Sequence, residues 1–492
     1  MKLKVRVLDL EADHPIVVLN KEDARKIGVY SGARVEMRFG DEHVVAVVDE
    51  TEKVVPPGEI GLFENILRKF SSVPKELEVL PSPDPKSVLY IRKKLDGRRL
   101  SPDEIHEIIM DVVEERLTSA EAAAFISASY IYGLNLDETV ALTNAIVDSG
   151  EQIRIDKHPV IDKHCIGGVP NNRTTMLYVP ILASLGFYVP KTSSRAITSP
   201  AGTADTMEVL APVDLTAEEI KEITETVGGV MAWGGGTRIA AADDKLIAIR
   251  RPLALDPRGM LLASIMAKKK AVSSEYVLID IPVGEGAKLP TVRAGEDLAK
   301  DFITLGERLG MHVKVVITDG SAPIGRGVGP VLEARDVLLI LEGKGPSDLR
   351  EKGTELVAHM LSFVKDMDYE TAKKLAERQI DSGAALKKMR EIIEAQGGDP
   401  EVKPEDLKPA KYSETIYAER DGVVTRIDNK AVATIARMAG APFEKGAGMY
   451  LHRVRGDRVK KGDPLYTVYS ASKRLLKDAL ELGLKPYTIE PR

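Results

Sequence analysis

Apolar and polar positions alternate over the first part of the chain, residues 1–84. From Leu3 to Val7, for example, Lys4 and Arg6 separate apolar residues, and a period of two predicts half-buried strands. Asn20 has the character of a helix N-cap before a short helix. The proline-rich residues LPSPDP at 80–85 then predict a linker. We therefore expect a small β domain over residues 1–84.

The apolar spacing changes to three and four over residues 86–154, which predicts helices. Three helix starts share the capping-box pattern, in which a hydroxyl or amide residue precedes glutamate by three positions. They are Ser101 with Glu104, Thr118 with Glu121, and Asn135 with Glu138. Gly133 and Gly150 are suited to end helices. This block is predicted to be all-helical.

A strand–loop–helix pattern occurs twice between residues 155 and 239. The residues PVIDKH predict a short strand, and Phe187 to Val189 predict a second one. Between them, Met176 to Leu185 predicts an apolar helix that Gly186 ends. Ligands of such units bind on the loops at the carboxyl ends of the strands. The two polar loops after these strands are therefore candidates for a binding site.

Both loops have the composition of an anion-binding site. Glycine exposes backbone N–H groups, a helix N-terminus adds positive potential, and cations pair with phosphate. The first loop contains Lys163, His164, Gly167, Gly168, Thr174 and Thr175, and the second contains Ser193, Ser194, Arg195, Thr198, Ser199, Gly202 and Thr203. The alternative is that these residues only form turns and helix caps. Two such loops in one unit, each with a cation, favour a site for two phosphates.

Later segments repeat the strand–loop arrangement. The residues VLIDIPVGEGAK predict a strand that ends in a glycine turn carrying Lys288. A further predicted strand is followed by GRGVG, which lacks the lysine and the spacing of a P-loop. Residues 351–396 are helical in pattern, and strands around Gly-Asp turns follow from about residue 410.

The composition of the chain argues against several classes of protein. The 492 residues carry a formal net charge of −6 and one cysteine, Cys165, so neither nucleic-acid binding nor an internal disulfide is expected. The longest nearly apolar run, Met176 to Pro190, is too short to span a bilayer. The N-terminus lacks the apolar core of a signal peptide. We expect a cytoplasmic protein with no membrane partner and no metal site.

Several motifs resemble those of the thymidine and pyrimidine nucleoside phosphorylase family. They are DKHxxGG from Asp162, the SxR segment at Ser193 to Arg195, and GTxDxxE from Gly202 to Glu208. The sequence departs from the usual family pattern at KHCIGGVP and SSRAITSPAGT. This variant resembles the archaeal AMP phosphorylases, and the resemblance extends over most of the chain.

The resemblance implies an α/β fold with four parts. A central mixed-sheet α/β domain is expected over residues 155–239 and 273–409, and a small all-helical domain over 86–154 and 240–272. An N-terminal small β-barrel domain is expected over 1–84, and a C-terminal barrel-sandwich (α+β) domain over 410–492. The family forms dimers through the helical domain, so a homodimer or a larger homo-oligomer is expected.

The resemblance also implies a reaction. Inorganic phosphate would attack C1′ of AMP and release the base and ribose 1,5-bisphosphate, in nucleotide salvage or degradation. CMP and UMP are further expected substrates. Phosphate is a co-substrate, and no cofactor is expected.

Site residues follow from the matched motifs. Asp256 is the implied catalytic acid that protonates the departing base, although an aspartate before Pro257 also suits a helix N-cap. The implied substrate-binding residues are Gly168, Ser194, Arg195, Ala196, Ile197, Thr198, Ser199, Thr203, Ser264 and Lys288. Among them, Ser264 and Lys288 would contact the base. His164 has an assisting role in the family, whereas such a histidine is by itself more often structural.

Three alternative functions are consistent with the sequence. The first is a nucleoside phosphorylase that acts on thymidine or uridine. The second is a phosphoribosyltransferase resembling the anthranilate enzyme, which would require Mg²⁺ and pyrophosphate. The third is a non-catalytic sensor that binds AMP and releases no base.

Overall fold

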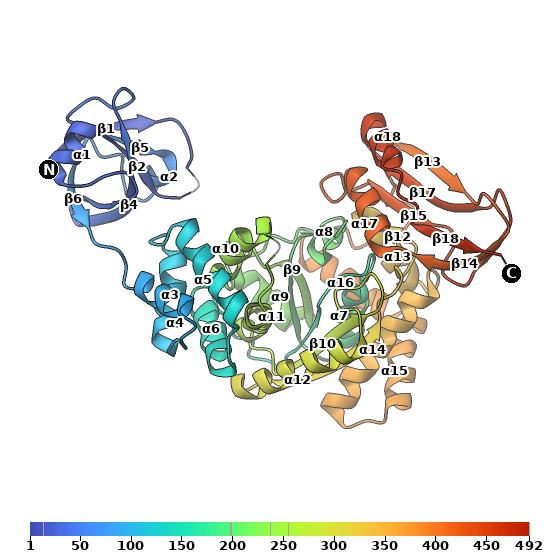
Figure 1. The fold of residues 1–492 in the computed structure, drawn as a ribbon. Coiled ribbons are helices and arrows are strands. Elements are labelled where there is room, and N and C mark those ends of the chain that lie inside the picture. Colours follow the sequence, from blue (N-terminus) through green and yellow to red (C-terminus); the bar gives the residue numbers. More distant parts are fainter. Residues whose placement is uncertain (13, 197–198, 237, 254, 492) are drawn as a thin grey trace. The chain divides into compact units, whose positions relative to one another are not determined.

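The computed structural model describes residues 1–12, 14–196, 199–236, 238–253 and 255–491. The chain divides into two compact units. The first contains Met1–Ser149 and Ala241–Ser264, and the second contains Gly150–Ala240 and Ile265–Arg492. Figure 1 labels the elements of both units. The boundaries of the four domains expected from the sequence stay a prediction.

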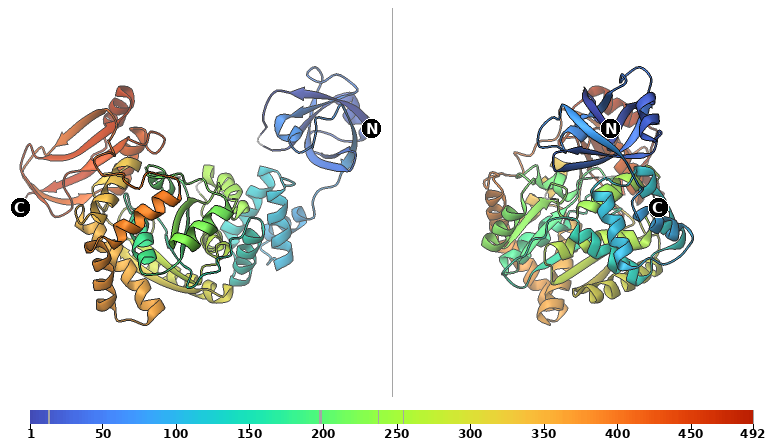
Figure 2. Two further views of the ribbon diagram at one scale, coloured as in Figure 1. Left: turned by 180° about the vertical axis from the view of Figure 1, so that it is seen from behind. Right: turned by 90° about the vertical axis from the view of Figure 1, so that its left-hand side faces the viewer.

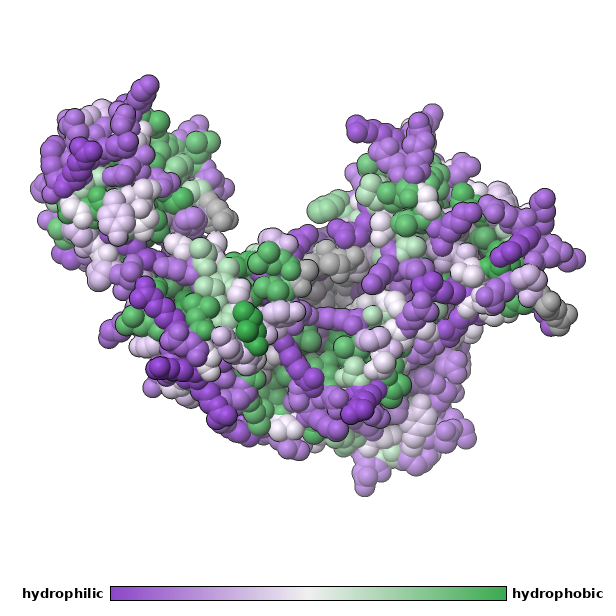
Figure 3. Space-filling model, viewed as in Figure 1, coloured by the Kyte–Doolittle hydropathy of each residue, from purple (hydrophilic) through white to green (hydrophobic). Residues whose placement is uncertain are grey.

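A closed six-stranded barrel begins the first unit: the alternating pattern predicts a small β domain here, and the family resemblance implies its barrel form. Its strands, in spatial order, are β1 (Lys2–Leu8), β5 (Glu59–Phe63), β2 (Ile16–Asn20), β4 (Glu42–Thr51), β3 (Arg34–Phe39) and β6 (Glu76–Ser82). The alternating apolar side chains fill the interior, where Leu19, Met37 and Ile60 are fully buried. Helix α1 (Lys21–Ile27) begins at the predicted Asn20 cap, and α2 (Glu64–Leu67) follows β5. Hydrophilic residues predominate on the barrel face seen in Figure 3.

The helical part of the first unit confirms all three predicted capping boxes. Its helices are α3 (Ser87–Leu95), α4 (Pro102–Val113), α5 (Ser119–Tyr132), α6 (Leu136–Asp148), α10 (Ala241–Arg250), the short η1 (Arg251–Leu253) and the start of α11 (Arg258–Ala271). Arg34 of β3 ties the barrel to this part, because its guanidinium lies 2.6 Å from Asp84 and 2.5 Å from Glu121.

Parallel strands form the centre of the second unit. One sheet has the order β11 (His312–Asp319), β10 (Tyr276–Val283), β7 (Ile161–Cys165), and β8 (Val189–Ser193) pairs with β9 (Gly229–Trp233). A parallel bridge between Val160 and Tyr188 lies just before β7 and β8. The expectation of a mixed sheet is wrong for these strands, whose described pairings are all parallel. Helices connect each strand to the next, and such crossovers produce parallel neighbours.

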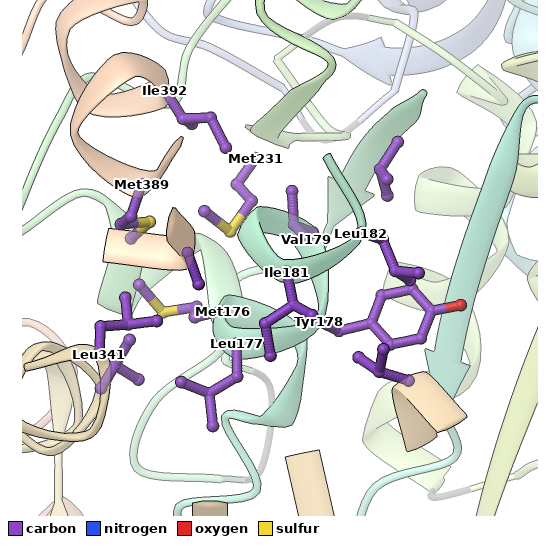
Figure 4. Close-up of a cluster of buried hydrophobic side chains, with 14 of the residues drawn as sticks. Met176, Leu177, Tyr178, Val179, Ile181, Leu182, Met231, Leu341, Met389 and Ile392 are labelled. Atoms are coloured by element: carbon purple, nitrogen blue, oxygen red, sulfur yellow. The ribbon is translucent and has the colours of Figure 1, made fainter. Parts of the chain in front are cut away.

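Helices flank these strands in both views of the unit (Figures 1 and 2). They are α7 (Thr174–Ser184), α8 (Thr203–Met207), α9 (Ala217–Val227), α12 (Val292–Leu309), α13 (Pro330–Leu341), α14 (Ser347–Lys365), α15 (Tyr369–Asp381) and α16 (Ala384–Ala395). The residues of α7 from Thr174 to Ala183 are all buried, as expected for a helix that is apolar on every side. Figure 4 shows its side chains packed against those of other elements, among them Met231, Leu341, Met389 and Ile392.

Two small sheets complete the second unit. The first has the order β12 (Gly327–Val328), β15 (Gly448–Leu451), β17 (Pro464–Ser470), β13 (Tyr412–Tyr417), and the second has β16 (Arg458–Val459), β14 (Gly422–Ile427), β18 (Tyr487–Glu490). Helices α17 (Asn429–Met438) and α18 (Lys473–Glu481) accompany them. Because β12 lies within GRGVG, that segment packs the C-terminal strands onto the rest of the unit. The barrel-sandwich description stays a prediction.

Among the described residues, no helix is both long enough and apolar enough to cross a membrane.

Gly353 tests how tightly α7 is packed. A Cβ at this position of α14 would lie 2.8 Å from Leu177 Cδ1. Gly353→Ala should therefore lower the urea midpoint, because overpacking costs about 1–3 kcal/mol and exceeds the gain in helix propensity of about 1 kcal/mol. In a Leu177→Ala background the added methyl group should be neutral or stabilising. An equal loss of stability in both backgrounds would show that the clash with Leu177 is not the cause.

Candidate functional site

The two predicted loops follow neighbouring parallel strands at their carboxyl ends. The first follows β7 and the second follows β8, and the segment that carries Lys288 follows β10. Gly168 has a φ of +96°, and a Cβ there would lie 2.7 Å from the backbone nitrogen of Lys288. Only glycine permits this approach without displacing the backbone. The structure thus brings the predicted residues Gly168 and Lys288 together.

A buried carboxylate, Asp162, anchors both strands. Lys269 Nζ of α11 donates to Asp162 Oδ2 at 2.6 Å, and Lys191 Nζ of β8 lies 3.3 Å from Oδ1. Lys191 also donates to the Lys163 carbonyl at 2.8 Å. All of these residues are buried. Burial lowers the pKa of Lys269 to about 7, with Asp162 opposing that shift and Lys191 adding to it.

A second buried carboxylate, Asp280 of β10, lies beside the first loop. Thr318 Oγ1 donates to it at 2.6 Å, and Lys352 Nζ lies 3.4 Å away. Burial acts to raise the pKa of Asp280, but Lys352 and Lys163 outweigh it, so the pKa lies below the ordinary value. Lys163 Nζ donates to Thr174 Oγ1 at 2.5 Å instead of to a carboxylate, and burial lowers its pKa.

The charges in these two clusters are unequal. Four buried lysines accompany two buried aspartates, namely Lys163, Lys191, Lys269 and Lys352 with Asp162 and Asp280. Where lysines outnumber carboxylates in a buried region, the protonated lysines produce a local potential that favours anions. This potential surrounds the base of the first loop.

Neighbouring His164 and Cys165 are neutral groups. Burial, followed by the charges of Lys269 and Lys191, holds the pKa of His164 well below its ordinary value. Burial also raises the pKa of the Cys165 thiol to about 11. The imidazole and the thiol are therefore uncharged near neutral pH, and any anion here depends on the lysines.

Asp205 closes the second loop. Its Oδ2 accepts from the backbone N–H of Ala196 at 2.6 Å and of Gly202 at 2.8 Å. A Cβ at Gly202 would lie 2.5 Å from the Ser194 carbonyl oxygen, so the two ends of the loop are in contact. Ser199 Oγ donates to Ala201 O at 3.0 Å. The predicted residues Ile197 and Thr198 lie outside the described residues.

Arg195 has carboxylate partners that the sequence analysis did not predict. Its guanidinium donates to both oxygens of Glu208, at 2.7 and 2.5 Å, and lies 4.7 Å from the centre of the Trp233 ring. Lys445 Nζ lies 2.5 Å from the same Glu208 carboxylate. The hydrogen bonds from Arg195, and next those from Lys445, lower the pKa of Glu208 to about 2 against the opposing effect of burial.

Thr203, the first residue of α8, is bound by a residue that the sequence analysis missed. Arg173 Nη1 donates to Thr203 Oγ1 at 2.8 Å. The only signal in the sequence is an arginine within the polar run of the first loop.

Two predicted residues, Asp256 and Ser264, belong to the first unit. Ser264 Oγ donates to buried Asp243 at 2.7 Å. Asp256 Oδ1 lies 3.2 Å from Arg250 Nη1, and the Asp256 side chain is 37% exposed. Arg250 thus orients a carboxylate that stays accessible.

Within the described ranges, no group of three or more histidine, cysteine, aspartate and glutamate residues is arranged to hold a metal ion.

Domain comparisons match three parts of the chain. Residues 88–150 match the helical bundle domain of a glycosyl transferase family, and residues 157–386 match its a/b domain. Residues 423–490 match the pyrimidine nucleoside phosphorylase C-terminal domain.

Solved structures of anthranilate phosphoribosyltransferases share the fold. The enzyme from Thermus thermophilus superposes with a TM-score of 0.54 at 18% identity, covering 62% of this chain and 98% of that one. The Saccharomyces cerevisiae enzyme in complex with PRPP and Mg has a TM-score of 0.52 at 15% identity, covering 63% and 98%. At these identities the likeness concerns the fold alone.

Similar sequences extend over nearly the whole chain. AMP phosphorylase from Methanosarcina mazei is 48% identical, covering 98% of this chain and 95% of its own. AMP phosphorylase 1 from Archaeoglobus fulgidus is 48% identical, covering 95% and 93%. AMP phosphorylase from Thermococcus sibiricus is 46% identical, covering 98% and 96%. Because nearly half of the residues are identical in alignments that cover almost the whole chain, the chain belongs to the AMP phosphorylase family.

Proposed function

We propose that this protein catalyses the phosphorolysis of AMP. An oxygen of inorganic phosphate forms a bond to C1′ of the ribose while the bond from C1′ to the adenine nitrogen breaks. The products are adenine and ribose 1,5-bisphosphate. The observation that carries the proposal is the pair of polar loops after adjacent parallel strands, beside buried lysines in excess of aspartates. The names of the full-length relatives support AMP as the substrate.

Each loop has its own phosphate in this proposal. The attacking phosphate binds at Gly168 and Thr203, where a backbone N–H and a hydroxyl act as donors. The nucleotide and its 5′-phosphate bind along the loop from Ser194 to Ser199. A positioned anionic nucleophile is the main requirement of such a displacement.

The departing base is handled by other residues. Asp256 protonates it, while Ser264 and Lys288 contact it. Protonation makes adenine a better leaving group, so the acid acts in the transition state. CMP and UMP are further substrates in this proposal, and the active protein is a cytoplasmic homodimer or larger homo-oligomer.

The reaction is tested by following adenine release from AMP by chromatography, with and without inorganic phosphate. Release should require phosphate and saturate with its concentration. Release without phosphate would indicate a hydrolase, and release only with pyrophosphate and Mg²⁺ would indicate a phosphoribosyltransferase. Binding of AMP without any release would indicate a sensor.

The 5′-phosphate should distinguish AMP from adenosine. A charge-assisted hydrogen bond contributes about 1.5–3 kcal/mol, so its loss should lower kcat/KM by about 10- to 150-fold. The wild type should therefore prefer AMP by at least this factor. Arg195→Gln should reduce the rate with AMP and leave the rate with adenosine unchanged.

Arg350→Gln provides the matched control, because Arg350 also pairs with a carboxylate, Asp381, at 2.6 Å but on α14. It should leave both rates unchanged. Equal kcat/KM for AMP and adenosine in the wild type would show that the loop does not read the 5′-phosphate.

Asp256→Asn should abolish most turnover while AMP still binds. Losing general acid catalysis typically costs a factor of about 10²–10⁴ in rate, and the loss should appear in kcat. Asparagine caps helices about as well as aspartate, so a purely structural role predicts nearly unchanged turnover. The measurements are AMP binding by calorimetry and adenine release.

Asp96→Asn serves as the control for this substitution, since Asp96 is an exposed residue at the end of α3 in the same unit. It should retain full activity. If Asp256→Asn were equally active, Asp256 would not be the proton donor.

A further inference from the structure

Arg173 connects the two loops and a third element. It precedes α7 as the N-cap residue and is 9% exposed. Its Nη1 donates to Thr203 Oγ1 at 2.8 Å, and its Nη2 donates to Ala201 O at 3.0 Å. Its Nε lies 2.5 Å from Oε2 of Glu333, a buried residue of α13. One side chain at the end of the first loop thus holds the residues that end the second.

The donor character of arginine fixes the role of the Thr203 hydroxyl. A guanidinium group has N–H donors and no acceptor, so Thr203 Oγ1 must accept this hydrogen bond. The single hydroxyl hydrogen then points away from Arg173. Among the contacts between described residues, none gives this hydrogen a protein acceptor. The hydroxyl can therefore donate its hydrogen to a ligand oxygen.

Glu333 holds the guanidinium in this orientation. Its Oε1 accepts from the backbone N–H of Gly329 at 3.1 Å, which fixes the carboxylate on its own side. Burial raises the pKa of Glu333 to about 7, and the charge of Arg173 opposes that rise. A buried ion pair contributes little net stability compared with an apolar pair. The close approach of these opposite charges nevertheless restricts where the guanidinium can lie.

We propose that Arg173 is a positioning residue for the attacking phosphate. It keeps the Thr203 hydroxyl oriented as a hydrogen-bond donor and sets the spacing between the two loops. Glu333 fixes the guanidinium that does this. The inference rests on the proposed phosphorolysis and adds to it two residues, Arg173 and Glu333, that do not touch the substrates.

A double-mutant cycle between Arg173 and Thr203 tests the proposal. The variants are Arg173→Gln, Thr203→Val and the double substitution, and the measured quantities are kcat and the KM for inorganic phosphate. Thr203→Val should raise this KM by about tenfold or more, the value of one charge-assisted hydrogen bond. Arg173→Gln should raise it as well, with a smaller change in kcat and in the KM for AMP. In the Thr203→Val background, Arg173→Gln should have no further effect on the phosphate KM.

Two results for the phosphate KM would contradict this proposal. If Arg173→Gln raised the phosphate KM by the same factor with and without the Thr203 hydroxyl, the two residues would act independently and the proposal would fail. An unchanged phosphate KM in Arg173→Gln would also overturn it. A wild-type protein that released no adenine with phosphate would instead contradict the proposed function itself.

A second variant separates a loss of stability from a loss of phosphate binding. Arg173→Gln leaves the buried Glu333 carboxylate without its cation, which destabilises a protein, whereas Arg173→Gln with Glu333→Gln removes both charges. The thermal midpoint of this pair should return toward the wild-type value while the phosphate KM stays raised. Recovery of both quantities together would show that Arg173 serves stability alone.

Discussion

The pairing of Asp162 with two lysines is the interaction on which the proposed phosphate site depends. Asp162 lies on β7, and its two partners, Lys191 and Lys269, lie on β8 and α11. Lys191 also donates to the Lys163 carbonyl, so two contacts from β8 hold the strand that leads into the first loop. Because all of these groups are buried, breaking one contact would leave a charge without a partner, which typically costs several kcal/mol. The two loops therefore start from a rigid base.

Charged contacts also stabilise the two loops that follow these strands. The first loop lies beside lysines that outnumber their carboxylates, whereas the second loop is closed by Asp205 and by the pair of Arg195 with Glu208. The C-terminal part also takes part in this support. Lys445 contacts Glu208, and Arg426 lies 2.8 Å from Glu285 in the segment before Lys288. These contacts show which loops the C-terminal part supports.

Local signals predicted much of the fold, and long-range contacts explain what they missed. The capping boxes, the strand–loop–helix unit and the small N-terminal β domain follow from spacings within a few residues, whereas its barrel form came from the family resemblance. The rule that ligands bind at the carboxyl ends of strands placed the first loop and the Lys288 turn correctly, but the contact of Gly168 with the Lys288 backbone was not predicted. Pairs such as Arg173 with Glu333 join residues far apart in the chain and leave no periodic pattern. The incorrect expectation of a mixed sheet came from the family resemblance, whereas the strand–loop–helix pattern itself favours parallel neighbours.

The central claim is that inorganic phosphate, and not water, attacks AMP. Phosphorus-31 NMR of the protein with AMP and inorganic phosphate tests it most directly, because every phosphorus atom in the reaction gives a signal. The account predicts that AMP and inorganic phosphate disappear in equal amounts while two phosphomonoester signals of one product, ribose 1,5-bisphosphate, grow equally. Conversion of AMP to a single ribose 5-phosphate signal with inorganic phosphate unchanged would contradict it.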